Sequence, residues 1–245
     1  MSVVLQVNRD LDFAAYGVAY ARFGYVQIHN FLAPAAADAL AQIVGALPWR
    51  LLVQDEEEKN VMLSREQLAA MSPEQLRKLE SGVRERAARD VGYTYWTYPL
   101  IEAHLNGWDE GHPIHAFTQF LNSDEVLEVA RSVIGEPNVI KIDGHATNFS
   151  PRHYLTRHID EGLSGERRAA YTIGLSKDWR PDWGGLLLFF DSNDDVARGL
   201  LPRFNTLTVF DGRVPHAVSA VSSFAPRARV SIAGWFRDDA PRKGS

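Results

Sequence analysis

The sequence predicts one α+β domain, in which helices from the first half pack on the outside of an antiparallel sandwich or barrel from the second half. Three observations lead to this prediction. From about residue 138 onward, about eight short β-prone segments alternate with turn signals such as Ser150-Pro151 and Asp211-Gly212, a spacing typical of sandwiches and barrels. Before that point most of the chain has apolar residues at helical spacing. These helices have no strand partners of their own and no internal repeat divides the 245 residues, so we expect a single domain.

The first fifty residues predict a helix, a strand and a second helix. Residues 10–23 carry apolar side chains at roughly helical spacing, and Gly24 ends that segment. Residues 25–29 alternate in the manner of a short strand. An Ala-rich helix then runs from Pro34 to about Leu47, because proline is tolerated in the first turn of a helix, where its missing N–H costs little.

Residues 55–90 are rich in charge and predict further helix. A charge run occupies residues 55–59, and a helical stretch follows over residues 64–90. Within it Ser72 and Pro73 have the pattern of a fresh helix start, with the serine as cap and the proline at the first position. A solvated helical face explains this region, and a lid or a dimer contact is the alternative.

Residues 92–98 form an aromatic and β-prone segment that contains Tyr93, Tyr95 and Trp96. Its rings either line a pocket or belong to the core. Residues 55–98 as a whole form either a lid or an interface, and we expect selectivity for a ligand to depend on them.

An amphipathic helix at residues 124–134 ends the helical half, because Gly135 and Pro137 stop it. Short strand-like segments then follow one another to the end of the chain. They are Val139–Asp143, Ala146–Phe149, Tyr154–Ile159, Ala170–Leu175, Gly185–Phe190, Thr206–Phe210, Ala217–Val221 and Arg229–Phe236.

The composition excludes several classes of protein and site. The chain has no cysteine, so zinc sites with thiolate ligands, Fe–S clusters, cysteine nucleophiles and disulfide scaffolds are excluded. Any metal site must therefore use the 8 histidines and the 31 Asp and Glu residues. A net charge of −5 argues against a nucleic-acid partner. No apolar run reaches the roughly 18 residues of a membrane span and no secretory signal is visible, so we expect a cytoplasmic protein without a membrane partner. The oligomeric state is not indicated.

His158 and Asp160 are the first candidate metal ligands. Residues two apart in a strand point to the same face, so both side chains can reach one ion while Ile159 packs on the other side. Taken alone, the pair is better explained by a surface or capping role.

His216 is the second histidine of the candidate site. A buried-looking strand ends in the Asp211-Gly212 turn, and the chain re-enters sheet just after His216, which places this side chain at the mouth of a sheet. Two histidines and one carboxylate with open positions are typical of non-haem Fe(II) oxygenases. A zinc hydrolase site can use similar ligands, so the ligand types alone leave the metal open.

Arg229 and Ser231 open the last strand and share one face of it. An arginine that points into a sheet is costly unless it meets an anion, and its planar fork can hold a carboxylate with two hydrogen bonds. The serine hydroxyl adds a donor. An ion pair with an internal Asp or Glu is the alternative explanation.

In this order and spacing the motifs resemble those of the 2-oxoglutarate- and Fe(II)-dependent oxygenases, in particular the prolyl-4-hydroxylase-like branch. The resemblance covers residues 140–237 strongly, and a weaker similarity appears at residues 23–32. The matching segments are Tyr154-Leu-Thr-Arg-His158, His158-Ile-Asp160, Trp183-Gly-Gly-Leu-Leu-Leu-Phe189, Asn205-Thr-Leu-Thr-Val-Phe210, His216-Ala-Val218 and Arg229-Val-Ser-Ile-Ala-Gly-Trp-Phe236.

The resemblance implies a role for each candidate residue. His158, Asp160 and His216 would hold iron, and Arg229 would bind the distal carboxylate of 2-oxoglutarate. Ser231 would assist that arginine. Further co-substrate contacts are expected from Tyr171 and Asn148, although a slip of one residue would turn either side chain to the other face of its strand. The implied cofactors are Fe(II), 2-oxoglutarate and dioxygen, with ascorbate as an optional reductant.

The resemblance also implies a fold and an activity. The fold would be a double-stranded β-helix, a jelly-roll and cupin-like barrel, with the core at residues 138–237 and a mainly helical part at residues 1–137 of the single 1–245 domain. The activity would be hydroxylation of an unactivated C–H bond with release of succinate and CO2, and the substrate a prolyl residue in a protein or peptide, a free amino acid or a similar small molecule. A non-catalytic cupin-like binding protein and a zinc- or manganese-dependent hydrolase are the alternatives.

Overall fold

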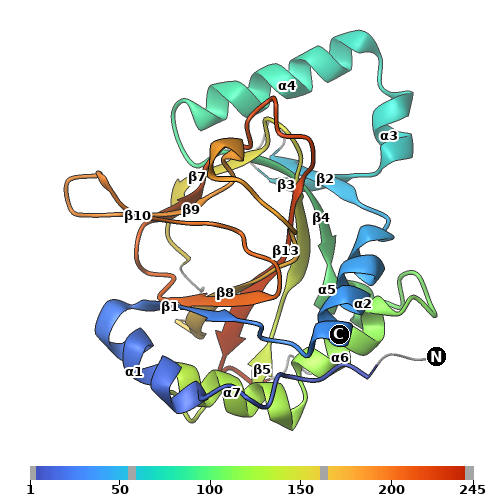
Figure 1. The fold of residues 1–245 in the computed structure, drawn as a ribbon. Coiled ribbons are helices and arrows are strands. Elements are labelled where there is room, and N and C mark those ends of the chain that lie inside the picture. Colours follow the sequence, from blue (N-terminus) through green and yellow to red (C-terminus); the bar gives the residue numbers. More distant parts are fainter. Residues whose placement is uncertain (1–3, 55–58, 161–164, 241–245) are drawn as a thin grey trace.

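The computed structural model describes residues 4–54, 59–160 and 165–240. The strands of this part of the chain all belong to one curled, antiparallel sheet (Figure 1). The strands are β1 Tyr25–His29, β2 Arg50–Gln54, β3 Asn60–Leu63, β4 Tyr93–Pro99, β5 Lys141–Ile142, β6 His145–Phe149, β7 Tyr154–His158, β8 Arg167–Gly174, β9 Leu187–Phe190, β10 Val196–Leu200, β11 Thr206–Phe210, β12 His216–Val218 and β13 Arg229–Arg237.

The sheet curls because one strand belongs to both of its halves. The strand order is β1-β11-β8-β13-β6-β4-β7-β12-β9-β10. The end of β4 pairs with β6, and its start pairs with β7. Ala170 and Phe210 of one half contact Leu187 and Phe189 of the other, so the two halves face each other across an interior. This is the double-stranded β-helix that the sequence motifs imply.

Most of the helices cover the outer face of one half of the sheet, which is formed by β1, β11, β8, β13 and β6. The helices are α1 Phe13–Phe23, α2 Pro34–Gly45, α3 Arg65–Ala70, α4 Pro73–Ala87, α5 Leu100–Leu105, α6 Ile114–Leu121 and α7 Asp124–Ile134. One core joins apolar side chains of α2, α5, α6 and α7 to those of β1, β8, β11 and β13. The helices α3 and α4 bury no residue fully. They lie at the opposite end of the molecule from α1 and α7 (Figure 1).

Successive side chains of a strand point alternately into the helix-covered core and into the barrel interior. On β8, Ile173 belongs to the helix-covered core, whereas Thr172 lines an interior cavity. On β13, Ile232 belongs to that core, whereas Arg229 and Ser231 line the same interior cavity. The period of two therefore decides which side chains can take part in a site.

One sequence-based expectation about the first half is wrong. The described part of the first half contributes four strands of its own to the sheet, in addition to its helices. The strand β1 pairs with β11, β4 pairs with β6 and β7, and β2 pairs with both β3 and β4. The helical stretch predicted over residues 64–90 is two helices, and α4 begins with the Ser72 cap and Pro73 as expected. Residues 55–58 of the charge run lie outside the described residues. The described part of the chain contains no helix that is long and apolar enough to cross a membrane.

Candidate metal centre

Three side chains predicted as metal ligands meet at one end of the barrel interior. His158 is the last residue of β7, His216 is the first residue of β12, and the two residues are paired across these antiparallel strands. Asp160 follows β7 by two residues. The His158 Nε2 to Asp160 Oδ1 distance is 3.6 Å and the His216 Nε2 to Asp160 Oδ2 distance is 3.4 Å. All three ligand atoms lie within 4.8 Å of one another.

Backbone carbonyl groups fix both imidazole rings. His158 Nδ1 lies 2.9 Å from the Thr156 carbonyl oxygen, and His216 Nδ1 lies 2.9 Å from the Val214 carbonyl oxygen. A carbonyl can only accept, so each Nδ1 carries the proton and donates it. Each Nε2 is then left with a lone pair directed at the cluster. Metal-binding histidines have this arrangement, in which an outer hydrogen bond sets the tautomer and the ring orientation.

Asp160 is held as an anion between the two rings. Burial raises the pKa of the Asp160 carboxyl group, and the adjacent His158 and His216 side chains outweigh burial and lower that pKa. The Asp160 side chain is only 12% exposed, and both Nε2 atoms face it with lone pairs, so a cation between these three groups is needed to balance the charge of the carboxylate.

A close backbone approach sets the position of Asp160. Its N–H donates to the Gly212 carbonyl oxygen at 2.7 Å. A Cβ atom at position 212 would lie 2.8 Å from the Asp160 Cβ, closer than two such atoms can approach. Glycine is therefore required in the Asp211-Gly212 turn for the carboxylate to point at the two histidines.

The donor set fits a divalent metal ion. Two ligands at roughly 2.1 Å from an ion and at right angles lie about 3 Å apart, close to the observed separations of 3.4 and 3.6 Å. Those separations are long for hydrogen bonds. Two imidazoles and one carboxylate suit Fe(II), and they also suit Zn(II).

The side chains of His158, Asp160 and His216 line a cavity of about 310 Å³, which we call the metal cavity. Its wall combines aromatic and aliphatic side chains with polar and charged ones, which include Thr147, Arg167 and Arg229 as well as the three candidate ligands. Tyr93, Tyr95, Phe149, Leu155, Val218 and Trp235 provide much of the apolar wall. Such a cavity binds a small molecule by enclosing it and orienting it through a few polar contacts.

Two arginines line this cavity, Arg167 and Arg229, and Arg229 is the more deeply buried of the two. Its side chain is 3% exposed, no carboxylate of the described residues pairs with it, and its Nε has no hydrogen-bond partner. Burial alone lowers the pKa of its guanidinium to about 10. Because a buried and unpaired guanidinium is unfavourable, the structure has a place for an anion here. The predicted alternative, an ion pair with an internal Asp or Glu, does not occur within the described residues.

Neighbouring side chains hold the arginine stem in place. The guanidinium carbon lies 5.1 Å from the centroid of the Phe149 ring. At Gly185, where φ is +62°, a Cβ atom would lie 3.1 Å from Arg229 Cδ. The Trp183-Gly-Gly motif of the sequence therefore forms a wall against the arginine, and the indole of Trp179 fixes that wall by donating to the Gly184 carbonyl oxygen at 2.9 Å.

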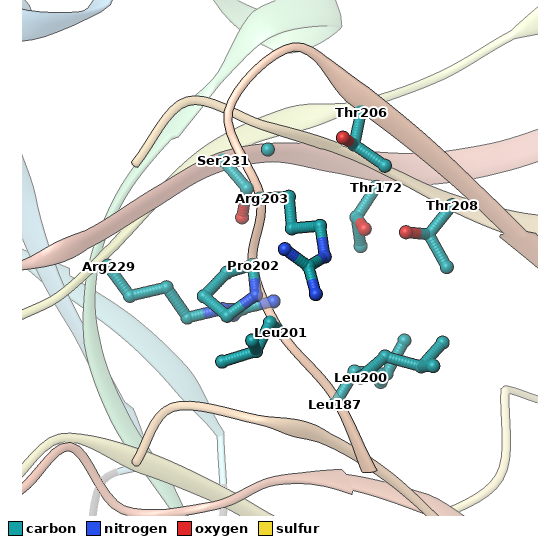
Figure 2. A pocket seen from close by; sticks show the side chains of 11 residues that line it. Thr172, Leu187, Leu200, Leu201, Pro202, Arg203, Thr206, Thr208, Arg229 and Ser231 are labelled. Carbon is teal, nitrogen blue, oxygen red and sulfur yellow. The ribbon is translucent and has the colours of Figure 1, made fainter. Parts of the chain in front are cut away.

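Ser231 also lines the cavity, and it is buried beside Arg229 on β13 (Figure 2). Its hydroxyl lies 2.8 Å from the Thr147 hydroxyl, which also lies 3.2 Å from the Ser231 carbonyl oxygen and donates to it. When the Thr147 proton is used within this pair, the Ser231 proton is free for a ligand.

Tyr171 and Asn148 differ in their position relative to the metal cavity. Tyr171 is among the residues that line it; its ring also packs in the helix-covered core, and its hydroxyl donates to the Asp143 carbonyl oxygen at 2.9 Å. Asn148 is not among the lining residues, whereas its neighbour Thr147 is. The register of β6 therefore turns Thr147, and not Asn148, to the interior.

The aromatic side chains of β4 lie on two faces, so the segment contributes both to a pocket and to the core, the two alternatives that its sequence offers. Tyr93 and Tyr95 line the metal cavity, whereas Trp96 packs against the helix-covered core and lies under the guanidinium of Arg65. His145 and Trp235, which sequence reasoning did not single out, also line the cavity. Only the alternation on their strands, once the register is known, identifies them.

The metal cavity continues outward into a groove of about 430 Å³, which we call the outer groove. Tyr95, His145 and Trp235 line both spaces. The groove then runs past Met62 and the start of α5. A ligand at the metal centre can therefore extend from the cavity along the surface of the molecule.

Comparisons with known proteins agree with this geometry. Residues 144–237 match the family model described as 2OG-Fe(II) oxygenase superfamily. No curated protein sequence matches the chain.

Solved structures match nearly the whole chain. A prolyl-4-hydroxylase from Pseudomonas putida is 18% identical, with a TM-score of 0.53, and the match covers 93% of this chain and 99% of that one. A 2OG-Fe(II) oxygenase-family oxidoreductase from Burkholderia pseudomallei is 10% identical, with a TM-score of 0.60 and coverage of 96% and 94%. A prolyl hydroxylase from Trichoplax adhaerens, solved with a hypoxia inducible factor peptide fragment, is 17% identical, with a TM-score of 0.57 and coverage of 92% and 89%. At these identities the likeness establishes the fold.

Proposed function

Because residues 144–237 match the family model of the 2OG-Fe(II) oxygenase superfamily, we propose that this protein is an oxidoreductase that hydroxylates an unactivated C–H bond of a prolyl residue in a protein or peptide. Enzymes of this superfamily need Fe(II), 2-oxoglutarate and dioxygen. His158, Asp160 and His216 are the residues that would hold the iron. With these groups bound, the centre supplies activated oxygen for the C–H bond, while 2-oxoglutarate is converted to succinate and CO2.

The unpaired guanidinium of Arg229 is the observation that carries the proposal. It lines the same cavity as the three metal ligands, and it lacks the carboxylate that its burial calls for. 2-Oxoglutarate has a keto acid end that can chelate a metal and a second carboxylate at its other end. A bidentate pair between that carboxylate and Arg229 satisfies the guanidinium. Ser231 adds a hydroxyl donor at the same place.

The other cavity residues orient ligands and exclude water. The carbonyl groups behind His158 and His216 keep both Nε2 atoms directed at the metal. Phe149, Leu155 and Val218 form an apolar wall that lowers the local dielectric and protects a reactive centre from side reactions. The chain thus contributes placement and exclusion, and the cofactors contribute the oxidation.

The outer groove supports a polypeptide substrate over a free amino acid. A free amino acid needs only the metal cavity, whereas a peptide needs space on both sides of the side chain that reaches the metal. The groove meets the cavity between Tyr95 and Trp235, so a backbone lying in the groove can direct one side chain inward. Two of the proteins with similar structures are named as prolyl hydroxylases, and one of them was solved with a peptide.

A titration of the protein with Fe(II) and 2-oxoglutarate under anaerobic conditions tests the reaction class. We expect a weak visible charge-transfer band that appears only when both are present. Proline-containing peptides and free amino acids are then supplied with air, and the products are examined for succinate and for the mass of one added oxygen atom. The absence of both the band and succinate would contradict an oxygenase, and a mass gain in free amino acids but not in peptides would contradict a polypeptide substrate.

A zinc- or manganese-dependent hydrolase is the alternative reaction at the same ligands. Such an enzyme needs a carboxylate near the metal to act as general base. Among the described residues that line the metal cavity, Asp160 is the only carboxylate, and it is itself a ligand. A hydrolase also has no use for Arg229. Zn(II)-loaded protein should therefore form no succinate and release no hydrolysis product from the same peptides.

A further inference from the structure

Beyond Arg229 the barrel interior ends in a small compartment of about 10 Å³, which we call the far compartment (Figure 2). On β11, Phe210 lies beside the His216 ring at 4.9 Å between centroids, whereas Thr206 and Thr208 line the far compartment. Thr208, the nearer of these two threonines, is two residues from Phe210, which is roughly 7 Å along a strand. The near side of the far compartment is thus separated from the metal ligands by the length of a small dicarboxylate.

Arg203 belongs to the segment that closes this end of the barrel. The segment Leu200–Arg203 connects β10 to β11 and lines the far compartment, where Figure 2 shows the side chains of Arg203 and Arg229. The Arg203 N–H donates to the Leu201 carbonyl oxygen at 2.9 Å. Its own carbonyl oxygen packs so closely on Gly174 that a Cβ there would lie 2.1 Å away. These contacts fix the origin of the Arg203 side chain at the compartment.

The far compartment is positively charged and rich in hydroxyl groups. Its lining contains two arginines and, within the described residues, no carboxylate. Arg203 is also close enough to His29 to contribute, after burial, to the lowered pKa of that imidazole. Thr208 accepts a hydrogen bond from Gln27 Nε2 at 3.2 Å, so its own proton is free for another acceptor. The group that completes this arrangement is an anion with several acceptor positions.

We propose that Arg203 is a second binding residue for the distal carboxylate of the co-substrate. This inference rests on the proposed function, because it takes 2-oxoglutarate to be the ligand that Arg229 holds. Arg229 approaches the carboxylate from β13, within the sheet, and Arg203 approaches it from the closing segment. A carboxylate has about four lone-pair sites, so one bidentate arginine leaves acceptor capacity for a second cation and for hydroxyl groups. Because Arg203 is an exposed residue, its attraction is screened by salt in a way that the buried Arg229 pair is not.

The test compares two ligands that differ only in the distal carboxylate. Anaerobic calorimetry of Fe(II)-loaded protein measures the affinity for 2-oxoglutarate and for 2-oxopentanoate, which has the same carbon chain without the second carboxylate. The variant is Arg203→Gln. The matched control is Arg198→Gln, which removes the same charge from an exposed site on β10 that does not line either space.

We expect Arg203→Gln to weaken 2-oxoglutarate binding about fivefold at low salt and to leave 2-oxopentanoate binding unchanged. The difference should shrink between about 0.05 M and about 0.5 M NaCl. Equal affinity of wild type and variant for 2-oxoglutarate would overturn the inference, and so would an equal loss for both ligands, which indicates a general disturbance of the site. If wild-type protein does not bind 2-oxoglutarate at all, the proposed function itself fails, so the two failures are distinguishable.

Discussion

Replacing Arg229 by methionine should stabilise the ligand-free protein and abolish tight binding of 2-oxoglutarate. The guanidinium is almost fully buried without an anion, and burial lowers its pKa from 12.5 to about 10. At 1.36 kcal/mol per pH unit, that lowering corresponds to about 3 kcal/mol of unfavourable free energy in the folded state. Methionine has a similar length and no charge, and an apolar replacement of a buried charge often stabilises by about 1–4 kcal/mol.

The same substitution leaves the distal carboxylate of the co-substrate without its partner. Breaking a buried ion pair from one side costs about 3–5 kcal/mol, so the Kd for 2-oxoglutarate should rise by at least about a hundredfold. Affinity for Fe(II) should stay within about twofold, because none of the metal ligands contacts Arg229.

Two measurements on Arg229→Met check these expectations. Chemical unfolding of the metal-free protein gives the change in stability, and anaerobic calorimetry with Fe(II) gives the affinity for 2-oxoglutarate. Arg227→Met is the control, since Arg227 is an exposed residue near the same strand and its loss should change stability by less than about 0.5 kcal/mol. A variant that is less stable than wild type by more than about 1 kcal/mol, or one that still binds 2-oxoglutarate tightly, would refute the reasoning.

Three further substitutions test the site and its support. Gly212→Ala places a Cβ against that of Asp160 and should lower metal affinity about tenfold, as measured by Zn(II) titration. Gly199→Ala, where a Cβ meets only ordinary contacts, should leave that affinity unchanged, and equal affinity of both variants would contradict the role of Gly212. Asn205 has φ +49° and exchanges two hydrogen bonds with the Leu32 backbone, so Asn205→Ala should cost about 3 kcal/mol of unfolding free energy; a loss below about 1 kcal/mol in urea unfolding would show that the motif asparagine is not structural. Burial lowers the pKa of His145 against the opposing charge of Asp143, so the stability from its neutral form is present above a pH of about 6.5 and is lost as the pH falls. His145→Phe should therefore flatten the loss of stability between pH 7 and pH 5 by up to about 1.4 kcal/mol per pH unit, and an unchanged slope in metal-free protein would argue against this titration.

The cluster of His158, Asp160 and His216 could be predicted from the sequence because its residues stand in motifs of characteristic order and spacing. His158 and Asp160 lie on one short segment, where the period of a strand alone places both side chains on the same face. His216 and Arg229 follow turn signals that mark the ends of strands. The structure then brings together the groups that these motifs contribute.

The remaining cavity residues depend on information that the sequence does not contain. Whether Asn148 or Thr147 faces the interior is decided by how β6 pairs with β13 and β4. Arg203 lies between two strands, where no periodicity indicates the direction of its side chain.

Several elements were missed for identifiable physical reasons. The strand β10 is mostly exposed and includes Arg198 and Gly199, so it lacks the alternation by which a strand is recognised. The helices α5 and α6 have six and eight residues, too short for a clear helical period. The strands β2 and β3 lie on either side of the charge run at residues 55–59, and so much charge in a short segment conceals the pattern of a strand pair.

The long-range pairing of β1 with β11 and the shared pairing of β4 have a consequence for how the chain is made. Tyr25 pairs with Phe210, so an early strand leaving the ribosome must wait for nearly the whole chain before its partner exists. Until then β1 and β4 present unpaired edges, which are prone to join other chains. Such non-local sheets fold in milliseconds to seconds rather than microseconds. Production of this protein should therefore benefit from slow synthesis at low temperature, and a fragment limited to residues 144–237 should aggregate, because β6, β7 and β11 would each lack a neighbour.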